Sequence, residues 1–208
     1  ARGAFCGGFL YHRENTQVVV GLIVDLGYRN PYLSPFDEFQ RYKHHPRIAE
    51  YLRGGKRVSY GARAIIKGGL PALPKLSVPG ALLVGDDAGF LNMLKIKGSH
   101  TAMKSGMLAA EAVFEALAGG STGGADLMSF TEKFKASWLY DELYVARNAE
   151  PALHKLGAFF GSAFTWFDQT VFRGRAPFTL SDPVPDYATL MRASDAPKID
   201  YPKPDNVL

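Results

Sequence analysis

Residues 81–118 read ALLVGDDAGFLNMLKIKGSHTAMKSGMLAAEAVFEALA, and this stretch decides how the chain is interpreted. A short apolar run is followed by an acidic turn, a glycine-rich loop and a helix that runs from Ser99 to Ala118. We predict a buried strand at residues 81–84, which places Asp86 where that strand ends. The first turn of the helix has no acidic side chain, and its unpaired backbone N–H groups favour an anionic ligand. The stretch therefore predicts a strand–loop–helix suited to a nucleotide cofactor.

Two interpretations of this segment remain open on the pattern alone. In the first, Asp86 accepts a hydrogen bond from a ribose or ribityl hydroxyl, with Asp87 as its rival, and Ser99 caps the helix. Gly89 and Gly98 would let the backbone approach that ligand closely. In the second, the helix only packs closely against a sheet, and the glycines serve turn geometry.

Composition narrows the possible classes of protein. The 208 residues suffice for one or two domains, and 47% apolar with 21% charged residues is ordinary for a globular protein. The net charge is only +4, and the basic residues are scattered without a nucleic-acid-binding motif, so we expect no nucleic-acid partner. The single cysteine, Cys6, excludes a disulfide framework and a self-contained iron–sulfur cluster. Adjacent His44 and His45 do not share a helix face, so we expect no metal site.

The flanking segments predict an α/β (α+β) fold with a mixed sheet. Two β-rich arms at 5–12 and 17–26 form a hairpin, and the apolar character of both faces of the second arm predicts a central, covered strand. Residues 56–64 read as a further strand. Short helices begin at Ser34–Pro35 and at Pro46, a longer helix runs from about Asp126 to Asn148, and a further helix begins at Pro151. We predict four parts, which are residues 1–75, 76–120, 121–175 and a proline-rich extended tail at 176–208.

An aromatic segment, LGAFFGSAFTWFDQTVF at 156–172, is too short to span a bilayer. It has one charged residue, Asp168. Phe160, Phe164 and Phe167 belong to one apolar stripe along the predicted helix. Such a helix lies either at a membrane surface or in a protein core, and the pattern alone favours the core.

Several segments together resemble the electron-transfer flavoprotein–ubiquinone oxidoreductase family. In the central stretch the resemblance rests on Gly89-Phe90, Asn92, residues 95–98 (KIKG) and residues 100–106 (HTAMKSG). The family-like segments elsewhere, in chain order, are GGFLYH at 7–12, NPYLSPF at 30–36, EFQR at 38–41, KHHP at 43–46, GGKR at 54–57, YGARA at 60–64 and YPKPD at 201–205. They cover nearly the whole chain in the right order.

The resemblance implies a membrane-associated flavoprotein that accepts electrons from reduced electron-transfer flavoprotein and passes them to ubiquinone. It implies FAD and, in the full-length protein, a 4Fe-4S cluster outside this chain. The residues that would line FAD are Gly85, Asp86, Gly98, Ser99, Thr101, Ala102, Met103 and Gly106. The backbone of Gly7 and Gly8 would meet the quinone, and no side chain is assigned a catalytic role. The aromatic segment, with Phe160, Phe164 and Phe167, would face the membrane, on the bacterial cytoplasmic face or the mitochondrial matrix face of an inner membrane.

Two departures from the family pattern affect these expectations. Phe5-Cys6-Gly7-Gly8 stands where the family has Tyr-Gly-Gly-Ser, so either glycine is a candidate for the quinone contact. The family's first FAD fingerprint and its cysteine-rich domain are absent from the sequence. We therefore expect a fragment that is inactive in isolation and binds FAD weakly. The alternative is a related FAD-dependent reductase or hydroxylase of an isoprenoid or aromatic substrate, and a non-catalytic structural module is a third possibility.

Overall fold

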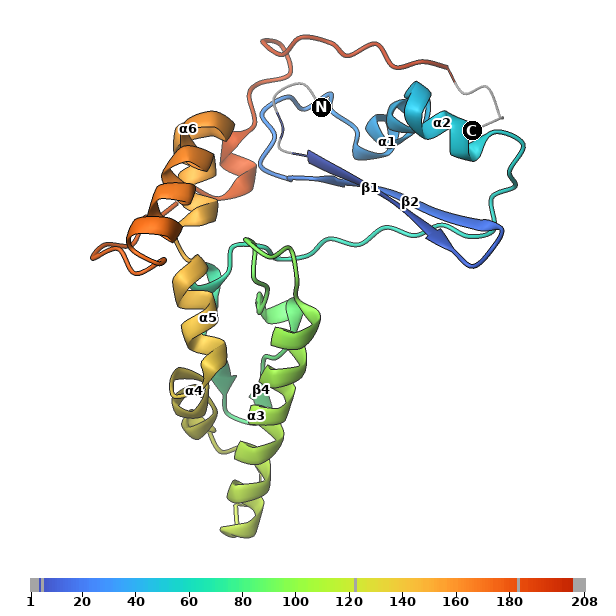
Figure 1. Cartoon of the computed structure of the whole chain (residues 1–208). Helices are drawn as coiled ribbons and strands as arrows, with labels where there is room; N and C mark the ends of the chain where they lie inside the picture. Colours follow the sequence, from blue (N-terminus) through green and yellow to red (C-terminus); the bar gives the residue numbers. More distant parts are fainter. Residues whose placement is uncertain (1–3, 5, 122, 183, 204–208) are drawn as a thin grey trace. The chain divides into compact units, whose positions relative to one another are not determined.

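Residues 4, 6–121, 123–182 and 184–203 are described in a computed structural model of the chain (Figure 1). The chain divides into two units. The first consists of residues 1–61 together with 183–208, and the second of residues 62–182. The mixture of helices and small sheets confirms the predicted α/β class, although both sheets of the described chain are two-stranded and antiparallel. The predicted Phe5 lies outside the described residues.

The first unit is built on a hairpin of β1 (Cys6–Arg13) and β2 (Gln17–Val24), which confirms the predicted pair of arms. Its register pairs Cys6 with Val24 and Gly8 with Leu22. The prediction that β2 is covered on both faces is wrong in this unit, because Val19 and Ile23 are 43% and 47% exposed. The two strands form one layer; α1 packs against β2, and the Tyr51 ring of α2 meets His12 of β1 with ring centroids 5.4 Å apart.

Two short helices follow the hairpin, as the sequence predicts. Helix α1 spans Pro35–Lys43, and the N–H of Asp37 donates to the Ser34 hydroxyl at 3.2 Å, so Ser34 is its N-terminal cap. Helix α2 spans Pro46–Leu52 and is followed by Gly54 with φ +74°. Leu33 and Ala49 are buried here, which gives this unit a small apolar centre.

The proline-rich tail returns to the first unit and lies along it. The N–H of Met191 donates to the Arg29 carbonyl at 2.9 Å, and the Asn30 side-chain amide donates to the Pro197 carbonyl at 2.8 Å. The tail has only one short helix, the 3-10 helix Asp186–Thr189. Its described part is thus extended as predicted.

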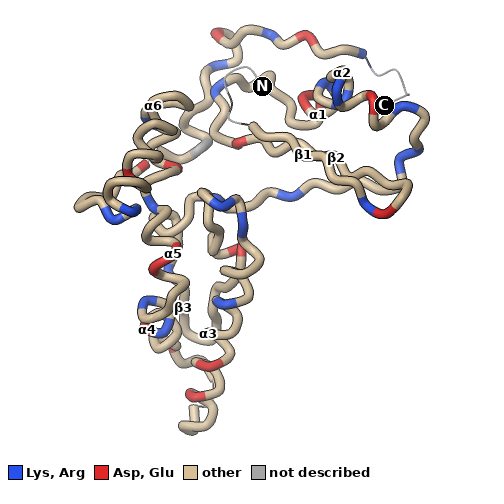
Figure 2. The backbone as a smooth tube through the Cα atoms, in the orientation of Figure 1, with Lys and Arg blue, Asp and Glu red and all other residues tan. Residues whose placement is uncertain are grey.

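The second unit consists mainly of helices, with one small ladder. Its elements in chain order are a 3-10 turn at Leu70–Ala72, β3 (Ser77–Val78), β4 (Ala81–Leu82), a 3-10 turn at Asp86–Ala88, α3 (Ser99–Ala118), α4 (Met128–Lys135), α5 (Trp138–Ala146) and α6 (Ala149–Val171). The predicted bounds of α3 are confirmed. Figure 2 shows lysines and arginines spread along both units rather than gathered in one stretch.

Three sequence predictions fail in and around this second unit. Residues 56–64 form no strand, and the most apolar of them, Val58 and Tyr60, are 81% and 88% exposed with no strand beside them. The strand at 81–84 shortens to two residues and is not buried, because Gly80 and Gly85 both turn the chain with positive φ. The helix predicted to run from Asp126 to Asn148 breaks at Ser137, whose hydroxyl donates to the Phe134 carbonyl at 2.7 Å.

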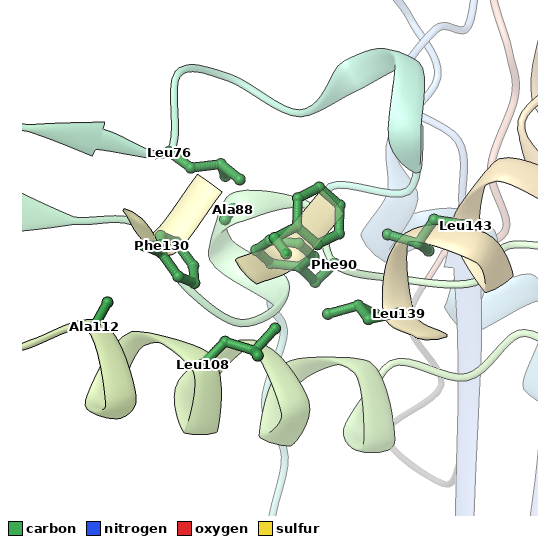
Figure 3. Close-up of a cluster of buried hydrophobic side chains, with 9 residues drawn as sticks. Leu76, Ala88, Phe90, Leu108, Ala112, Phe130, Leu139 and Leu143 are labelled. Carbon is green, nitrogen blue, oxygen red and sulfur yellow. The ribbon is translucent and has the colours of Figure 1, made fainter. Parts of the chain in front are cut away.

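The break between α4 and α5 lets both helices face one core (Figure 3). The core of this unit consists of Leu76, Ala88, Phe90, Leu108, Ala112, Phe130, Phe134, Leu139 and Leu143. Phe90 and Phe134 meet edge to face with ring centroids 5.1 Å apart. Phe90 follows the acidic turn directly, so burial of its ring fixes the loop before α3.

Candidate functional site

The turn before α3 is tied to that helix by one hydroxyl. The N–H of Gly85 donates to the Ser105 Oγ at 2.8 Å, and the same hydroxyl donates to the Ala102 carbonyl at 2.7 Å. Gly85 has φ +73°, a conformation that favours glycine. The predicted acidic turn and the predicted helix start therefore lie side by side.

The two rival carboxylates of this turn are in different surroundings. Asp87 is exposed and accepts a hydrogen bond from the Arg63 guanidinium at 2.9 Å. That side-chain hydrogen bond raises the pKa of Arg63, which keeps the pair charged. Asp86 is half-buried, and its carboxylate accepts no hydrogen bond from the described residues, although its charge also helps to raise the pKa of Arg63. Asp86 is therefore the carboxylate available to a ligand hydroxyl.

The loop into α3 is held by the backbone and by Thr101. Asn92 and Lys97 form a bridge, with N–H···O distances of 3.0 and 3.2 Å. The Thr101 side chain is fully buried, and its hydroxyl lies 2.5 Å from the Phe90 carbonyl and 2.8 Å from the Gly98 carbonyl. This residue orients the loop directly.

The N-terminus of α3 has no side-chain cap. The capping position is Gly98, so the prediction that Ser99 caps the helix is wrong: Ser99 is the first helical residue and is exposed. Without a cap, the first N–H groups of α3 are left for solvent or a ligand. Met103 is 70% exposed, and no described atom lies within 4 Å of the place where a Cβ would stand on Gly106. One face of the helix start is therefore thin and uncovered, which fits a flat anionic cofactor.

A polar cluster that the sequence patterns did not reveal stands beside this loop. Glu142 on α5 accepts hydrogen bonds from the Asn92 amide at 2.9 Å, from His100 at 2.7 Å and from Lys95 at 3.0 Å. Desolvation acts to raise the pKa of Glu142, but the hydrogen bonds from His100, Asn92 and Lys95 outweigh it and lower that pKa to about 2. The charged Glu142 carboxylate thus ties the loop before α3 to α5.

The first unit contains a cavity of about 320 Å³ next to the predicted quinone glycines. Its walls come from β1, β2, α1 and the residue before α2, namely Cys6, Gly7, Gly8, Leu22, Glu38, Arg41, Tyr42 and His45. The Tyr42 ring covers Gly8 so closely that a Cβ on Gly8 would stand 2.5 Å from it. The two glycines therefore expose backbone to a space of ligand size.

One wall of this cavity is a buried ion pair. Glu38 is only 4% exposed, and the Arg41 guanidinium donates to its Oε2 at 2.5 Å. Its other oxygen accepts a hydrogen bond at 3.1 Å from the hydroxyl of Tyr201, which also accepts from the N–H of Ser34. The sequence placed Glu38 and Arg41 only in the family-like segment EFQR and Tyr201 only in YPKPD, and no pattern linked the two segments.

Helix α6 turns its polar side inward. Asp168 is 2% exposed, whereas Phe160 and Phe167 are 68% and 46% exposed. Phe164 is half-buried and lies against Phe178 with ring centroids 6.3 Å apart. The helix is kinked at Gly157, where φ is +74°. In the described chain, therefore, part of the aromatic side of α6 is exposed.

Among the described residues, no helix has the length and apolar character needed to cross a membrane.

The first unit belongs to a defined class of domain. Residues 1–65 match the family described as "ETF-QO, ubiquinone-binding", and this match covers the hairpin, both short helices and the cavity.

Known proteins extend the match along the chain. It is 65% identical over 202 residues to the electron transfer flavoprotein-ubiquinone oxidoreductase of Pseudomonas aeruginosa, covering 97% of this chain and 37% of that protein. The mitochondrial protein of the same name from Bos taurus is 48% identical over 211 residues, covering 98% of this chain and 34% of that protein. The chain belongs to the electron transfer flavoprotein–ubiquinone oxidoreductase family, a family of oxidoreductases. It spans little more than a third of the length of these relatives.

Proposed function

We propose that the protein containing this chain passes electrons from reduced electron-transfer flavoprotein to ubiquinone. The observation that carries the proposal is the cavity beside Gly7 and Gly8, which lies within the residues that match a ubiquinone-binding domain. Neighbouring residues of a strand in an antiparallel ladder direct their backbone groups alternately toward and away from the partner strand. One of the two glycines thus offers its N–H and C=O to the quinone rather than to β2.

The second part of the proposal is that the turn and start of α3 hold FAD. Bound FAD would supply the electron-carrying ring. The half-buried Asp86 would accept a hydrogen bond from a cofactor hydroxyl, and the uncapped N–H groups after Gly98 would face negative charge. Ser99, Ala102, Met103 and Gly106 would form the thin face beside it. Thr101 would act by fixing the loop, since its hydroxyl is already held by two carbonyls.

The adjacent carboxylates provide a matched test of the FAD site. In the intact protein, Asp86→Asn should weaken FAD binding by about tenfold, the effect of losing one charge-assisted hydrogen bond. Asp87→Asn is the control, because that carboxylate is exposed and engaged by Arg63. Equal losses in fluorescence titrations of the two apoprotein variants would contradict the assignment of Asp86.

We further propose that α6 contacts the membrane surface from one side. Phe160, Phe164 and Phe167 would enter the interface, and Arg173 and Arg175 at the end of the helix would meet anionic headgroups. The protein would then be peripheral on an inner membrane, either bacterial or mitochondrial, and a mitochondrial relative is among the similar proteins.

Liposome flotation tests this surface. Phe160→Asp should reduce co-flotation with anionic vesicles, while Phe114→Asp on α3 serves as the control because Phe114 is also exposed, at 73%. If the two variants float equally well and both remain folded, the aromatic face of α6 does not bind lipid.

The activity itself is tested with the intact protein. Reduced electron-transfer flavoprotein should drive reduction of a short-chain ubiquinone analogue, and omission of the flavoprotein should abolish it. Oxidation of the flavoprotein without quinol formation would overturn the proposal. Turnover of an isoprenoid or aromatic substrate instead would favour the related reductase or hydroxylase. The 4Fe-4S cluster that the resemblance implies would be held by residues beyond this chain, whose one cysteine is Cys6.

A further inference from the structure

Besides Cys6 and Tyr42, three ionisable side chains line the quinone cavity, Glu38, Arg41 and His45, and they differ in what they can do with a proton. Glu38 and Arg41 come from α1, and His45 stands immediately before α2. Reduction of a quinone to a quinol consumes two protons along with two electrons. A group in the cavity wall that can release a proton therefore bears on the proposed reaction.

Two of the three groups are held in place. An arginine does not lose its proton near neutral pH. Both carboxylate oxygens of Glu38 already accept hydrogen bonds, one from Arg41 at 2.5 Å and one from Tyr201 at 3.1 Å. The buried ion pair therefore provides a fixed, charge-balanced wall, and its carboxylate carries no proton to donate to a ligand.

His45 differs from Glu38 and Arg41 in its exposure to solvent and in its hydrogen bonding. Its side chain is exposed to solvent, and its ring has no hydrogen-bond or ion-pair partner among the described residues. Its backbone, rather than its ring, starts α2, since its carbonyl accepts from the N–H groups of Ile48 and Ala49. Histidine is the side chain whose charge ordinarily changes between pH 5 and 8. The ring is thus free to take a proton from water and to present it to the cavity.

We propose that His45 is the proton donor to the reduced quinone in this cavity; the inference rests on the proposed function. The quinone accepts two electrons from the flavin that the proposed activity oxidises. The N–H bond of the His45 imidazolium breaks, and an O–H bond forms on one ring oxygen of the quinone. The other oxygen takes its proton from solvent water, and His45 regains its own proton from water.

The charged and titratable groups around His45 set the pH dependence of this step. Cys6 faces the cavity from β1, and Glu38, Arg41 and Tyr42 face it from α1, whereas β2 contributes only Leu22. The Glu38–Arg41 pair is charge-balanced, so the rate of quinol formation should fall with rising pH through loss of the proton that the proposed donor supplies.

The test uses the intact protein with His45→Gln, a change that keeps hydrogen-bonding capacity but removes the proton. We expect kcat for a ubiquinone analogue to fall about 100-fold with little change in KM, as for loss of a general acid. The fall in the rate of quinol formation with rising pH should disappear, while reduction of the flavin by electron-transfer flavoprotein should be unchanged. Free imidazole should partly restore quinol formation, since the site is open to solvent. His44→Gln is the control, because that residue does not line the cavity.

A second variant and a binding measurement distinguish failure of this inference from failure of the proposed function. Asparagine suits the position before a helix, so His45→Asn keeps α2 intact even if the glutamine variant is unstable. In this chain, a water-soluble quinone analogue should also protect His45, but not His154, from modification by diethyl pyrocarbonate. If both His45 variants keep more than half of the wild-type kcat and its pH profile, this inference fails while the proposed function stands. If the wild type does not reduce quinone, the proposed function itself fails.

Discussion

The Tyr201 hydroxyl donates a hydrogen bond to Glu38 at 3.1 Å across 163 residues of sequence. The same oxygen accepts from the N–H of Ser34 at 3.1 Å, next to the start of α1. The tail is thereby fastened to the helix that forms one wall of the cavity. Burial raises the pKa of Tyr201, and the hydrogen bond to Glu38 adds to that effect, so the phenol keeps its proton at neutral pH.

Tyr201→Phe removes both of these hydrogen bonds and leaves the ring in place. We expect a loss of about 1–2 kcal/mol in the local stability of the docked tail, because a buried carboxylate oxygen loses its donor. Hydrogen exchange at residues 184–203 should speed up correspondingly. Tyr187→Phe is the control, since Tyr187 is 78% exposed. Unchanged exchange in Tyr201→Phe would mean that the tail is held by its backbone bonds alone.

The lowered pKa of Glu142 predicts a window of acid sensitivity in the second unit. Its pKa of about 2 lies below the ordinary value of 4.5. Because the folded state keeps this carboxylate charged further into acid, its contribution to stability is complete above pH 4.5 and is lost as the pH falls toward 2. Urea unfolding of the chain should therefore show falling stability across this window.

Glu142→Gln should flatten that dependence and cost about 1–2 kcal/mol at neutral pH, since the exposed Lys95 contributes little. Glu111→Gln on α3 is a suitable control, because its carboxylate is 50% exposed and lies 3.9 Å from Lys133. A Glu142→Gln curve parallel to the wild type between pH 4.5 and 2 would show that the cluster does not titrate in this range.

The parts of the fold that the sequence predicted are those with strong local signals. Ser34 and Pro35 fix the start of α1 through a hydrogen bond three residues away, and Gly119 ends α3 as expected. The failures involve packing between distant segments. Burial of Phe134 and Leu139 in one core splits a helix that periodicity alone joins. Of the apolar run at 81–84, Leu82 packs against that core, whereas Leu83 and Val84 are 47% and 37% exposed.

In the candidate site, too, residues with strong local sequence signals were predictable, and residues that depend on distant partners were not. The glycines of the cavity and of the α3 loop were predictable through family resemblance, because their motifs are contiguous. Glu142, Tyr201 and the Glu38–Arg41 pair were not, since each acts through a partner that the chain brings from elsewhere or through burial that no local pattern reports.

Arg147 is a further residue whose role depends on distant partners. Its guanidinium donates to the carbonyls of Gly174, Ala176 and Phe178 at 2.7, 2.6 and 3.1 Å, and the side chain is 3% exposed. Lysine lacks the planar set of donors needed to serve these carbonyls together. Arg147→Lys should therefore destabilise the second unit by about 2–4 kcal/mol. In the same urea experiment, the exposed Arg175→Lys should change stability by less than about 0.5 kcal/mol.

The two glycines of the cavity predict opposite responses to a methyl group. A Cβ on Gly8 would stand 2.5 Å from the Tyr42 ring, so Gly8→Ala must push that ring out of the cavity wall, whereas Gly7 has no described atom within 4 Å of the same position. We expect Gly8→Ala to cost about 1–3 kcal/mol of stability and Gly7→Ala to cost little. Removing the obstructing ring in Gly8→Ala/Tyr42→Ala should make the two changes non-additive.

The same two variants, Gly7→Ala and Gly8→Ala, also test in the intact protein whether the quinone contacts β1. Side chains of neighbouring strand residues point to opposite faces, so a methyl on Gly7 points away from the face that carries Tyr42. Gly7→Ala should therefore leave both the melting temperature and KM for a ubiquinone analogue close to their wild-type values, whereas Gly8→Ala should change both. If Gly8→Ala lowers the melting temperature but leaves KM at the wild-type value, the quinone does not approach this strand, and the cavity has another occupant.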